Sequence, residues 1–154
     1  MLNTINTPKY IIKLISAQES YQVRHPVLRP GRAFETCIFD GDTLETTFHF
    51  GIFLNNQLLG ICSLFKNEHK NLSDAHQYQL RGMAVLAEQQ GKGLGKLVLN
   101  YAESFIKAKG ITTIWCNARE VATKFYTNLG YEIFGEPFEI EKIGTHYAMY
   151  KPLQ

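Results

Sequence analysis

The chain has 154 residues, 45% of them hydrophobic and 19% charged, with a formal net charge of +2 at pH 7. This length suits one domain with a substantial core and is short for two, so we expect a single domain over residues 1–154. The small net charge gives no support for nucleic-acid binding, and no stretch reaches the roughly 20 apolar residues of a membrane span.

The cysteines and histidines lack the spacing of a metal site or a disulfide framework. The three cysteines are an odd number without a C-x-x-C pair. His49, His69 and His76 are too scattered to form a metal site by spacing. Residues 1–9 also lack the apolar region of a signal peptide. We therefore expect no metal ion and a reducing, cytoplasmic environment.

The N-terminal segment predicts a strand followed by a short helix. Residues 10–15 are rich in β-branched side chains, which favour a strand. Ser16 is a suitable N-cap for a helix that runs to about residue 24. Pro26 and Pro30 then break regular structure.

Residues 27–45 show no clear period and predict a long loop or a broken helix. Such a loop is either a substrate-binding lid or a solvated connection whose arginines pair with neighbouring acids. Arg24, Arg29 and Arg32 would suit an acidic group on a substrate if their side chains converge.

The middle of the chain predicts three strands. Two of them, residues 46–54 and 58–65, are separated by Asn-Asn-Gln, which indicates a hairpin because Asn tolerates left-handed backbone angles. The third, residues 78–85, contains Gly82, and a glycine inside a strand often marks a β-bulge or a close backbone approach.

A glycine-rich loop, residues 90–96, follows this strand and opens a helix. Glycines at alternate positions, free N–H groups, the helix dipole and two lysines would suit a phosphate or pyrophosphate, although an ordinary turn would look similar. Neither the Walker loop nor the dinucleotide fingerprint matches. The pattern that does fit is Gln-x-x-Gly-x-Gly, formed by Gln90, Gly93 and Gly95.

The C-terminal half predicts a strand–helix–strand unit and further elements. Residues 94–108 form an amphipathic helix, and residues 111–116 form a buried strand, which together imply a right-handed parallel crossover. A second amphipathic helix covers residues 119–129. Closing strands at residues 131–134 and 146–150 are joined by a Pro- and Glu-containing linker.

Two motifs on these elements resemble the Gcn5-related N-acetyltransferase (GNAT) family. The first is the Gln-x-x-Gly-x-Gly loop between strand and helix. The second is Ala122-x-x-Phe125-Tyr126-x-x-x-Gly130-Tyr131 on the second helix. The resemblance implies an α/β (α+β) fold with a mixed central sheet of about six to seven strands flanked by helices. It also implies an N-acetyltransferase that moves acetyl from acetyl-CoA directly to a primary amine of a small molecule or peptide.

The resemblance also implies which residues bind acetyl-CoA. Backbone groups at the end of the bulged strand would bind the pantetheine, the glycine-rich loop would bind the pyrophosphate, and the tyrosine of the second motif would serve as general acid. The residues so implied are Met83, Ala84, Val85, Gln90, Gly91, Lys92, Gly93, Leu94, Gly95, Lys96, Asn117, Arg119 and Tyr126.

The sequence departs from the family pattern at two places. Arg119 stands where the second motif has Asn, so either Asn117 or Arg119 would reach the pantetheine. Gln79 stands where some members keep a glutamate base, and an amide cannot accept a proton at neutral pH. The candidate bases, in order of preference, are His146 and then Glu139, Glu35 and His76.

Three functions follow as hypotheses. The first is the N-acetyltransferase, acting on a small-molecule or peptide amine as a monomer or homodimer. The second is a catalytically degenerate module that binds or senses acyl-CoA, which the glutamine at position 79 would favour. The third, a scaffold that binds no coenzyme, is disfavoured by the intact loop.

Overall fold

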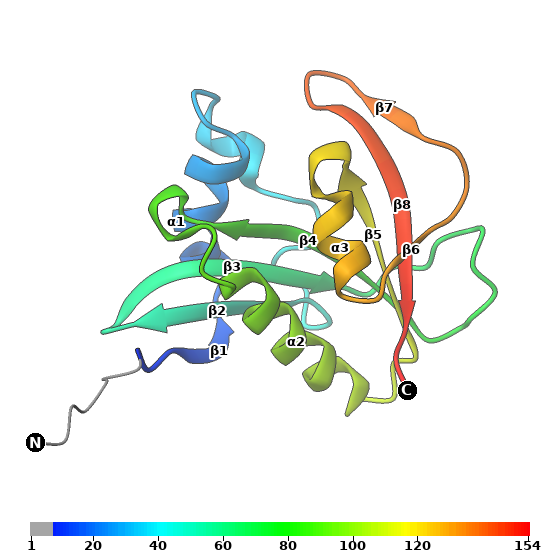
Figure 1. Ribbon diagram of the computed structural model, residues 1–154, viewed down its shortest axis with the longest axis horizontal. Coiled ribbons are helices and arrows are strands. Elements are labelled where there is room, and N and C mark those ends of the chain that lie inside the picture. Colours follow the sequence, from blue (N-terminus) through cyan, green and yellow to red (C-terminus); the bar gives the residue numbers. More distant parts are fainter. Residues whose placement is uncertain (1–7) are drawn as a thin grey trace, which may run out of the picture.

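The computed structural model of the protein describes residues 8–154 (Figure 1). Residues 1–7, most of the segment without a signal-peptide pattern, lie outside the described residues. The elements in chain order are β1 (Ile11–Ile15), α1 (Ala17–Leu28), η1 (Phe34–Cys37), β2 (Phe48–Leu54), β3 (Gln57–Phe65), β4 (Gln77–Val85), η2 (Ala87–Gln89), α2 (Leu94–Lys107), β5 (Thr113–Arg119), η3 (Glu120–Ala122), α3 (Thr123–Asn128), β6 (Glu132–Ile133), β7 (Phe138–Ile140) and β8 (Gly144–Pro152).

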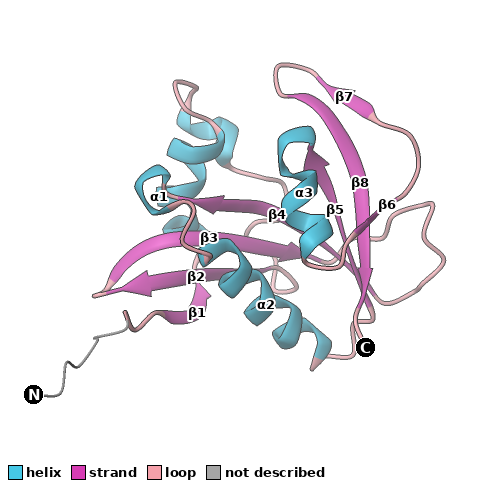
Figure 2. Cartoon of the chain, in the orientation of Figure 1, coloured by secondary structure: helices cyan, strands magenta, loops and turns pink. Residues whose placement is uncertain are grey.

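The strands form one mixed sheet in the order β1-β2-β3-β4-β5-β8-β6, with β7 paired to β8 (Figure 2). Among the strands of residues 8–154, only β4 and β5 pair in parallel, and α2 connects them, so the predicted parallel crossover is confirmed. The eight strands exceed the expected six to seven because the predicted linker contains β7. The predicted α/β architecture is otherwise confirmed.

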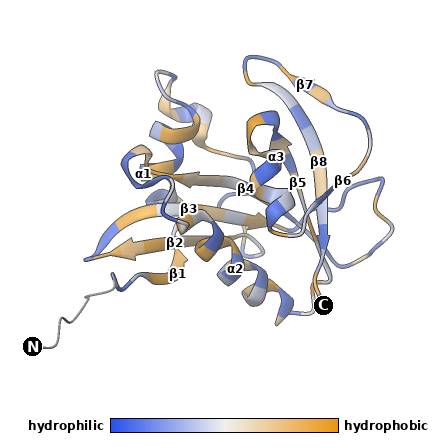
Figure 3. Ribbon diagram, viewed as in Figure 1, coloured by the Kyte–Doolittle hydropathy of each residue, from blue (hydrophilic) through white to orange (hydrophobic). Residues whose placement is uncertain are grey.

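Helices cover both faces of the sheet. On one face Val23 of α1 packs against Ile61 and Ala84. On the other face α2 and α3 share the main core with the strands, and Leu99 and Tyr126 are among its members. Figure 3 shows hydrophobic residues concentrated along β2 and β3, the strands under α2. None of the described helices is both long and apolar enough to cross a membrane.

The predicted N-cap of α1 is confirmed, but the helix is longer than expected. Ser16 and Glu19 exchange side-chain to backbone hydrogen bonds of 3.0 Å, which form a capping box. The helix continues through Pro26 to Leu28. Proline removes the N–H that would bond the carbonyl of Gln22, and because Gln22 is exposed, water can satisfy that carbonyl.

The second predicted helix begins later than expected. Arg119 belongs to β5, where it pairs with His146 of β8, and α3 starts only at Thr123 after the short η3. Sheet pairing therefore overrides the helical pattern at the start of that segment. The predicted hairpin is confirmed, since Asn55 and Asn56 have φ of 49° and 65°.

A β-bulge interrupts β4 at the position that Gly82 predicted. The register with β3 changes between the pairs Ile61↔Ala84 and Ser63↔Arg81, so that Gly82 and Met83 together oppose a single residue. Gly82 has φ of 67°, a conformation that L side chains rarely adopt. The bulge bends the second half of β4 away from the direction of the first half.

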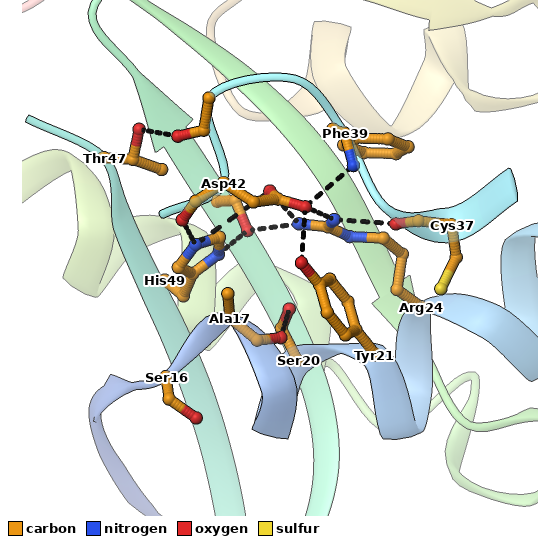
Figure 4. Close-up of polar contacts among 12 residues, drawn as sticks. Ser16, Ala17, Ser20, Tyr21, Arg24, Cys37, Phe39, Asp42, Thr47 and His49 are labelled. Atoms are coloured by element: carbon orange, nitrogen blue, oxygen red, sulfur yellow. Dashed lines mark hydrogen bonds and ion pairs between the residues drawn. The ribbon is translucent and has the colours of Figure 1, made fainter. Parts of the chain in front are cut away.

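The side chain of Arg24 fills the space beneath this bulge. A Cβ atom on Gly82 would lie 3.1 Å from Arg24 Nε, so any other residue would crowd the buried guanidinium, and the backbone angle also favours glycine there. Arg24 is fully buried and binds the two carboxylate oxygens of Asp42 at 2.7 and 3.1 Å (Figure 4). Tyr21 donates a further hydrogen bond to Asp42. The buried positive charge is therefore paired, which is what burial of a charge requires.

The ion pair is completed by Ser63 and His49. Arg24 Nη2 donates to Ser63 Oγ, which lies 2.6 Å from His49 Nδ1, and His49 Nε2 lies 2.8 Å from the carbonyl of Asp42. A carbonyl only accepts, so Nε2 carries the proton and Ser63 donates to Nδ1. Burial lowers the pKa of His49, which keeps the ring neutral and matches this arrangement. Removing one partner of such a buried pair typically costs about 3–5 kcal/mol.

Candidate coenzyme and acceptor site

A cleft of about 950 Å³ lies where β4 and β5 separate. The parallel pairing runs from Gln77↔Thr113 to Leu80↔Cys116 and ends two residues before Gly82, the first residue of the bulge in β4. Beyond that point the strand ends diverge, and their residues line the cleft together with the ends of α1, α2 and α3. A concave space of this size at the carboxyl ends of parallel strands is a common place for ligands.

The glycine-rich loop forms one end of the cleft. Gly93 is the N-cap of α2 with φ of 80°, and a Cβ there would meet nothing within 4 Å. Within the described chain, the backbone N–H groups of residues 91–96 donate to no other group. Six free donors beside the positive end of a helix, with Lys96 also lining the cleft, suit a pyrophosphate.

Two other residues of the loop pattern have structural contacts. Gln90 Nε2 donates to the carbonyl of Val85 at 3.0 Å and so ties the loop to the end of β4. A Cβ on Gly95 would lie 3.2 Å from Phe125, so this glycine permits close packing of α2 against α3. Lys92 lies exposed and donates to Gln89.

The end of β4 presents backbone groups to the cleft. Leu86 N–H donates to the carbonyl of Leu59 at 2.9 Å, on the β3 side. Because hydrogen-bonded pairs alternate along an antiparallel ladder, the backbone groups of Ala84 also face β3, and those of Met83 and Val85 face the cleft. All three residues line the cleft.

Asn117 and Arg119 both line the cleft from β5. They lie two residues apart and therefore share one face of the strand. Arg119 Nη2 donates to the carbonyl of Leu28 at 3.2 Å, which places this face on the side of α1. Asn117 is exposed, and its side chain has no hydrogen-bond partner among the described residues.

Tyr126 lines the cleft from the opposite face of the sheet, among the core residues of α2 and α3. Its hydroxyl makes no hydrogen bond to another described residue, although the side chain is only 7% exposed. Burial raises the pKa of Tyr126 well above its usual value, and the nearby Cys116 and Cys62 add to this effect. The hydroxyl is therefore protonated at neutral pH and free to donate to a ligand.

His146 is the only one of the four candidate bases that lines the cleft. It is directly opposite Arg119 in the β5–β8 pairing, so it shares the α1 face. His146 Nδ1 lies 2.8 Å from the carbonyl of Gly144, which can only accept, so Nδ1 carries the proton and Nε2 keeps a free lone pair in the neutral ring.

The other three candidates lie elsewhere. Glu139, on β7, accepts a hydrogen bond from Thr145 of β8. Glu35 is exposed on η1, and His76 precedes β4 at the end remote from the cleft. The side-chain oxygen of Gln79 accepts a hydrogen bond from Asn67 at 2.9 Å, which orients the amide group of Gln79. Within residues 8–154 no group of three or more His, Cys, Asp or Glu side chains could hold a metal ion.

The arginines are distributed differently from the predicted cluster. Arg24 forms an ion pair with Asp42, and Arg32 is exposed and does not line the cleft. Arg29, Arg81 and Arg119 line it instead. Sequence analysis missed Arg81, although a charged residue inside an expected buried strand, directly before the bulge glycine, was a usable indication.

Comparison with known proteins agrees with this geometry. The model of the acetyltransferase (GNAT) family matches residues 13–131, which is more than half of the chain. This chain belongs to the GNAT acetyltransferase family. The uncharacterised N-acetyltransferase YitI of Bacillus subtilis (strain 168) is 37% identical over 143 residues, which cover 93% of this chain and 96% of YitI.

Solved GNAT structures share the fold. A crystal structure of a candidate N-acetyltransferase from Lactobacillus plantarum has a TM-score of 0.76 at 20% identity, covering 97% of this chain and 100% of that chain. An aminoglycoside 6'-N-acetyltransferase complexed with coenzyme A has a TM-score of 0.74 at 14% identity, and the match covers 94% of this chain and 97% of that chain. At these identities the likeness concerns the fold.

The loop can be tested by two substitutions of Gly93 that differ only in charge. Gly93→Asp and Gly93→Asn carry similar backbone strain, because both residue types tolerate left-handed angles to a similar degree. Only Asp adds negative charge beside the N–H groups, so we expect it to weaken acetyl-CoA binding at least about tenfold more than Asn does. Isothermal titration gives the two Kd values, and equal values would show that the coenzyme phosphates bind elsewhere.

Proposed function

We propose that this chain transfers the acetyl group of acetyl-CoA directly to the primary amine of a small molecule or peptide. The observation that carries the proposal is the position of Tyr126 and His146 in one cleft. Tyr126 reaches it from the α2 and α3 face of the sheet, and His146 from the α1 face. A proton donor and a proton acceptor are thus available on opposite sides of the gap between β4 and β5.

In this proposal acetyl-CoA enters from the α2 side. The N–H groups of residues 91–96 bind the pyrophosphate, and the backbone groups of Met83 together with the N–H of Val85 bind the pantetheine amides. The thioester sulfur then lies near the hydroxyl of Tyr126. The amine approaches from the α1 side, where His146 and Arg119 lie, so the two substrates meet in the gap between the strands.

The reaction needs two protons removed from the nitrogen and the leaving sulfur stabilised. An alkylammonium has a pKa of about 10.4, so at neutral pH it must lose a proton, which His146 Nε2 accepts directly or through water. The neutral amine nitrogen attacks the acetyl carbonyl and a C–N bond forms. The nitrogen then releases its second proton to water, and the C–S bond breaks as the tetrahedral intermediate collapses. The leaving thiolate takes a hydrogen bond from Tyr126.

The raised pKa of Tyr126 limits what this residue does. A phenol whose pKa lies well above that of a thiol transfers its proton uphill, so its main contribution is a hydrogen bond that stabilises the developing thiolate. The residue is ready to donate at any pH near neutrality. Its role is therefore insensitive to pH in that range.

Direct transfer requires no covalent enzyme intermediate. Cys116 lines the cleft, but burial raises the pKa of its thiol, so it carries no thiolate at neutral pH. Alignment of two bound substrates in one cleft supplies much of the acceleration in reactions of this kind.

The role of Tyr126 is tested against a matched tyrosine. Tyr126→Phe removes a hydroxyl without a described protein partner, so we expect unchanged acetyl-CoA affinity and turnover that is slower by about a hundredfold. Tyr131 lies beside it, with ring centroids 5.5 Å apart, but donates to Glu103 and does not line the cleft. Tyr131→Phe should therefore reduce stability and leave turnover near the wild-type value.

Release of the coenzyme A thiol from acetyl-CoA over a panel of amines measures both variants. Undiminished turnover in Tyr126→Phe would remove the assigned role. Thermal stabilisation by acetyl-CoA without thiol release from any amine would instead identify an acyl-CoA-binding module.

The role of His146 is tested by the pH dependence of turnover. His146→Gln should lower kcat/KM by about a hundredfold at pH 7, because the amine then lacks a base. The deficit should shrink as the pH approaches about 10, where the amine loses its proton unaided. His69→Gln is the control, since His69 lies on Trp115 and Phe134 outside the cleft. A deficit that stays constant with pH would point to a structural role for His146.

A further inference from the structure

Three arginine side chains converge on the α1 side of the cleft. Arg29 Nη1 and Arg119 Nη2 donate to the same oxygen, the carbonyl of Leu28, at 3.0 and 3.2 Å. The guanidinium groups of Arg81 and Arg29 both lie over the ring of Phe39, with Cζ atoms 4.2 and 5.8 Å from the ring centroid. The three arginines follow α1 or belong to β4 and β5, so tertiary folding brings them together.

The charges of these arginines are not neutralised by the protein. Among the described residues no carboxylate lies within 4.0 Å of any of the three. Asp42 and Asp40 act on Arg81 only from a distance, and Asp42 is bound to Arg24. An arginine keeps its charge in proteins. The α1 side of the cleft therefore holds positive charge that a bound anion would offset.

The electrostatic environment of Arg29 supports this convergence. Burial lowers its pKa, and after burial the causes are the positive charges of other arginines, led by Arg119. Burial likewise lowers the pKa of Arg81, with Arg24 as the next cause. Each of these groups is thus held close to others of the same sign.

The cleft lining as a whole also carries positive charge that no carboxylate of the described lining offsets. It contains Lys96, the three arginines and His146, and no aspartate or glutamate among the described residues. A polyamine or an aminoglycoside carries further ammonium groups, which would face these cations without a carboxylate to bind them. The charge distribution disfavours polycationic acceptors.

We propose that the accepted amine also bears an oxyanion, a carboxylate or a phosphate, which binds Arg29, Arg81 and Arg119. This inference rests on the proposed acetyl transfer. The planar guanidinium fork matches the oxygens of both groups and forms paired hydrogen bonds with them. Arg81 has all of its N–H donors available, because it makes no hydrogen bond to another described residue.

The position of the arginines separates this site from the coenzyme phosphates. Arg119 pairs directly with His146, the proposed base, on the face of α1. The loop of residues 91–96 leads instead into α2 on the opposite face. The oxyanion therefore binds on the side from which the amine enters, and the same cations disfavour the ammonium form of that amine, which eases its deprotonation.

Anion binding is tested first, in the presence of saturating coenzyme A so that the phosphate sites of the coenzyme are filled. We expect succinate or inorganic phosphate at ten times its Kd to raise the Tm by about 3 °C. Arg81→Gln should remove this shift, and Arg81→Lys, which keeps the charge without the fork, should retain part of it. Arg32→Gln is the matched control, because Arg32 is exposed and outside the lining. Equal shifts in Arg81→Gln and Arg32→Gln would overturn the inference.

Acceptor preference is tested with pairs that differ in the anionic group. β-Alanine is compared with β-alaninamide, and phosphoethanolamine with ethanolamine, with spermidine as the polycation. We expect at least one anionic member to exceed its uncharged partner about tenfold or more in kcat/KM per unprotonated amine, and the pair that responds identifies carboxylate or phosphate. Preference for spermidine or for the uncharged members would contradict the proposal.

Two further outcomes separate the two levels of the proposal. Loss of acetyl-CoA affinity in Arg81→Gln, in parallel with the loss of anion binding, would assign the arginines to the coenzyme phosphates and overturn the inference. Absence of acetyl-CoA binding to the wild-type protein would reject the proposed function itself, whatever the anion titration shows.

Discussion

The buried ion pair between Arg24 and Asp42 is the interaction on which the shape of the cleft depends. Arg24 occupies the space under Gly82, where a glycine leaves room for the guanidinium and adopts the left-handed backbone without strain. The bulge at Gly82 bends β4, and the parallel pairing with β5 ends just before it. A buried pair is costly to break on one side. The network with His49 therefore holds the bent strand in one conformation and keeps the gap beside β5 open.

On the two sides of this gap, the faces of the sheet present different chemical groups. The α2 face offers free N–H groups and a buried tyrosine, which suit a phosphate-bearing thioester. The α1 face offers a histidine with a free lone pair and three arginines, which suit an acceptor that is an amine and an anion at once. Under the proposed function, transfer between ligands bound on opposite faces requires no nucleophile of the protein. The proposed acceptor side is built from Arg29 after α1, Arg81 of β4, Arg119 of β5 and His146 of β8.

The sequence was most informative where one local requirement determines the residue. Gly82 predicted a bulge, the paired asparagines predicted a hairpin, and the apolar period of residues 94–108 predicted α2, because each depends on backbone angle or helix period alone. The acceptor side could not be predicted in this way. Arg24 is paired with Asp42, 18 positions later, and the segment between them shows no helical or strand period. Arg81 and Arg29 are brought together where both lie over the ring of Phe39. Such contacts depend on tertiary folding and leave no spacing in the sequence.

The central claim is that acetyl-CoA lies in the gap between β4 and β5 with its sulfur at Tyr126. A crystal structure of the protein with coenzyme A tests it most directly. The account predicts pyrophosphate oxygens on the N–H groups of residues 91–96, pantetheine amides on Met83 and Val85, and the sulfur within hydrogen-bond distance of the Tyr126 hydroxyl. A coenzyme bound along the arginines of the α1 face, or with its sulfur remote from Tyr126, would contradict the account.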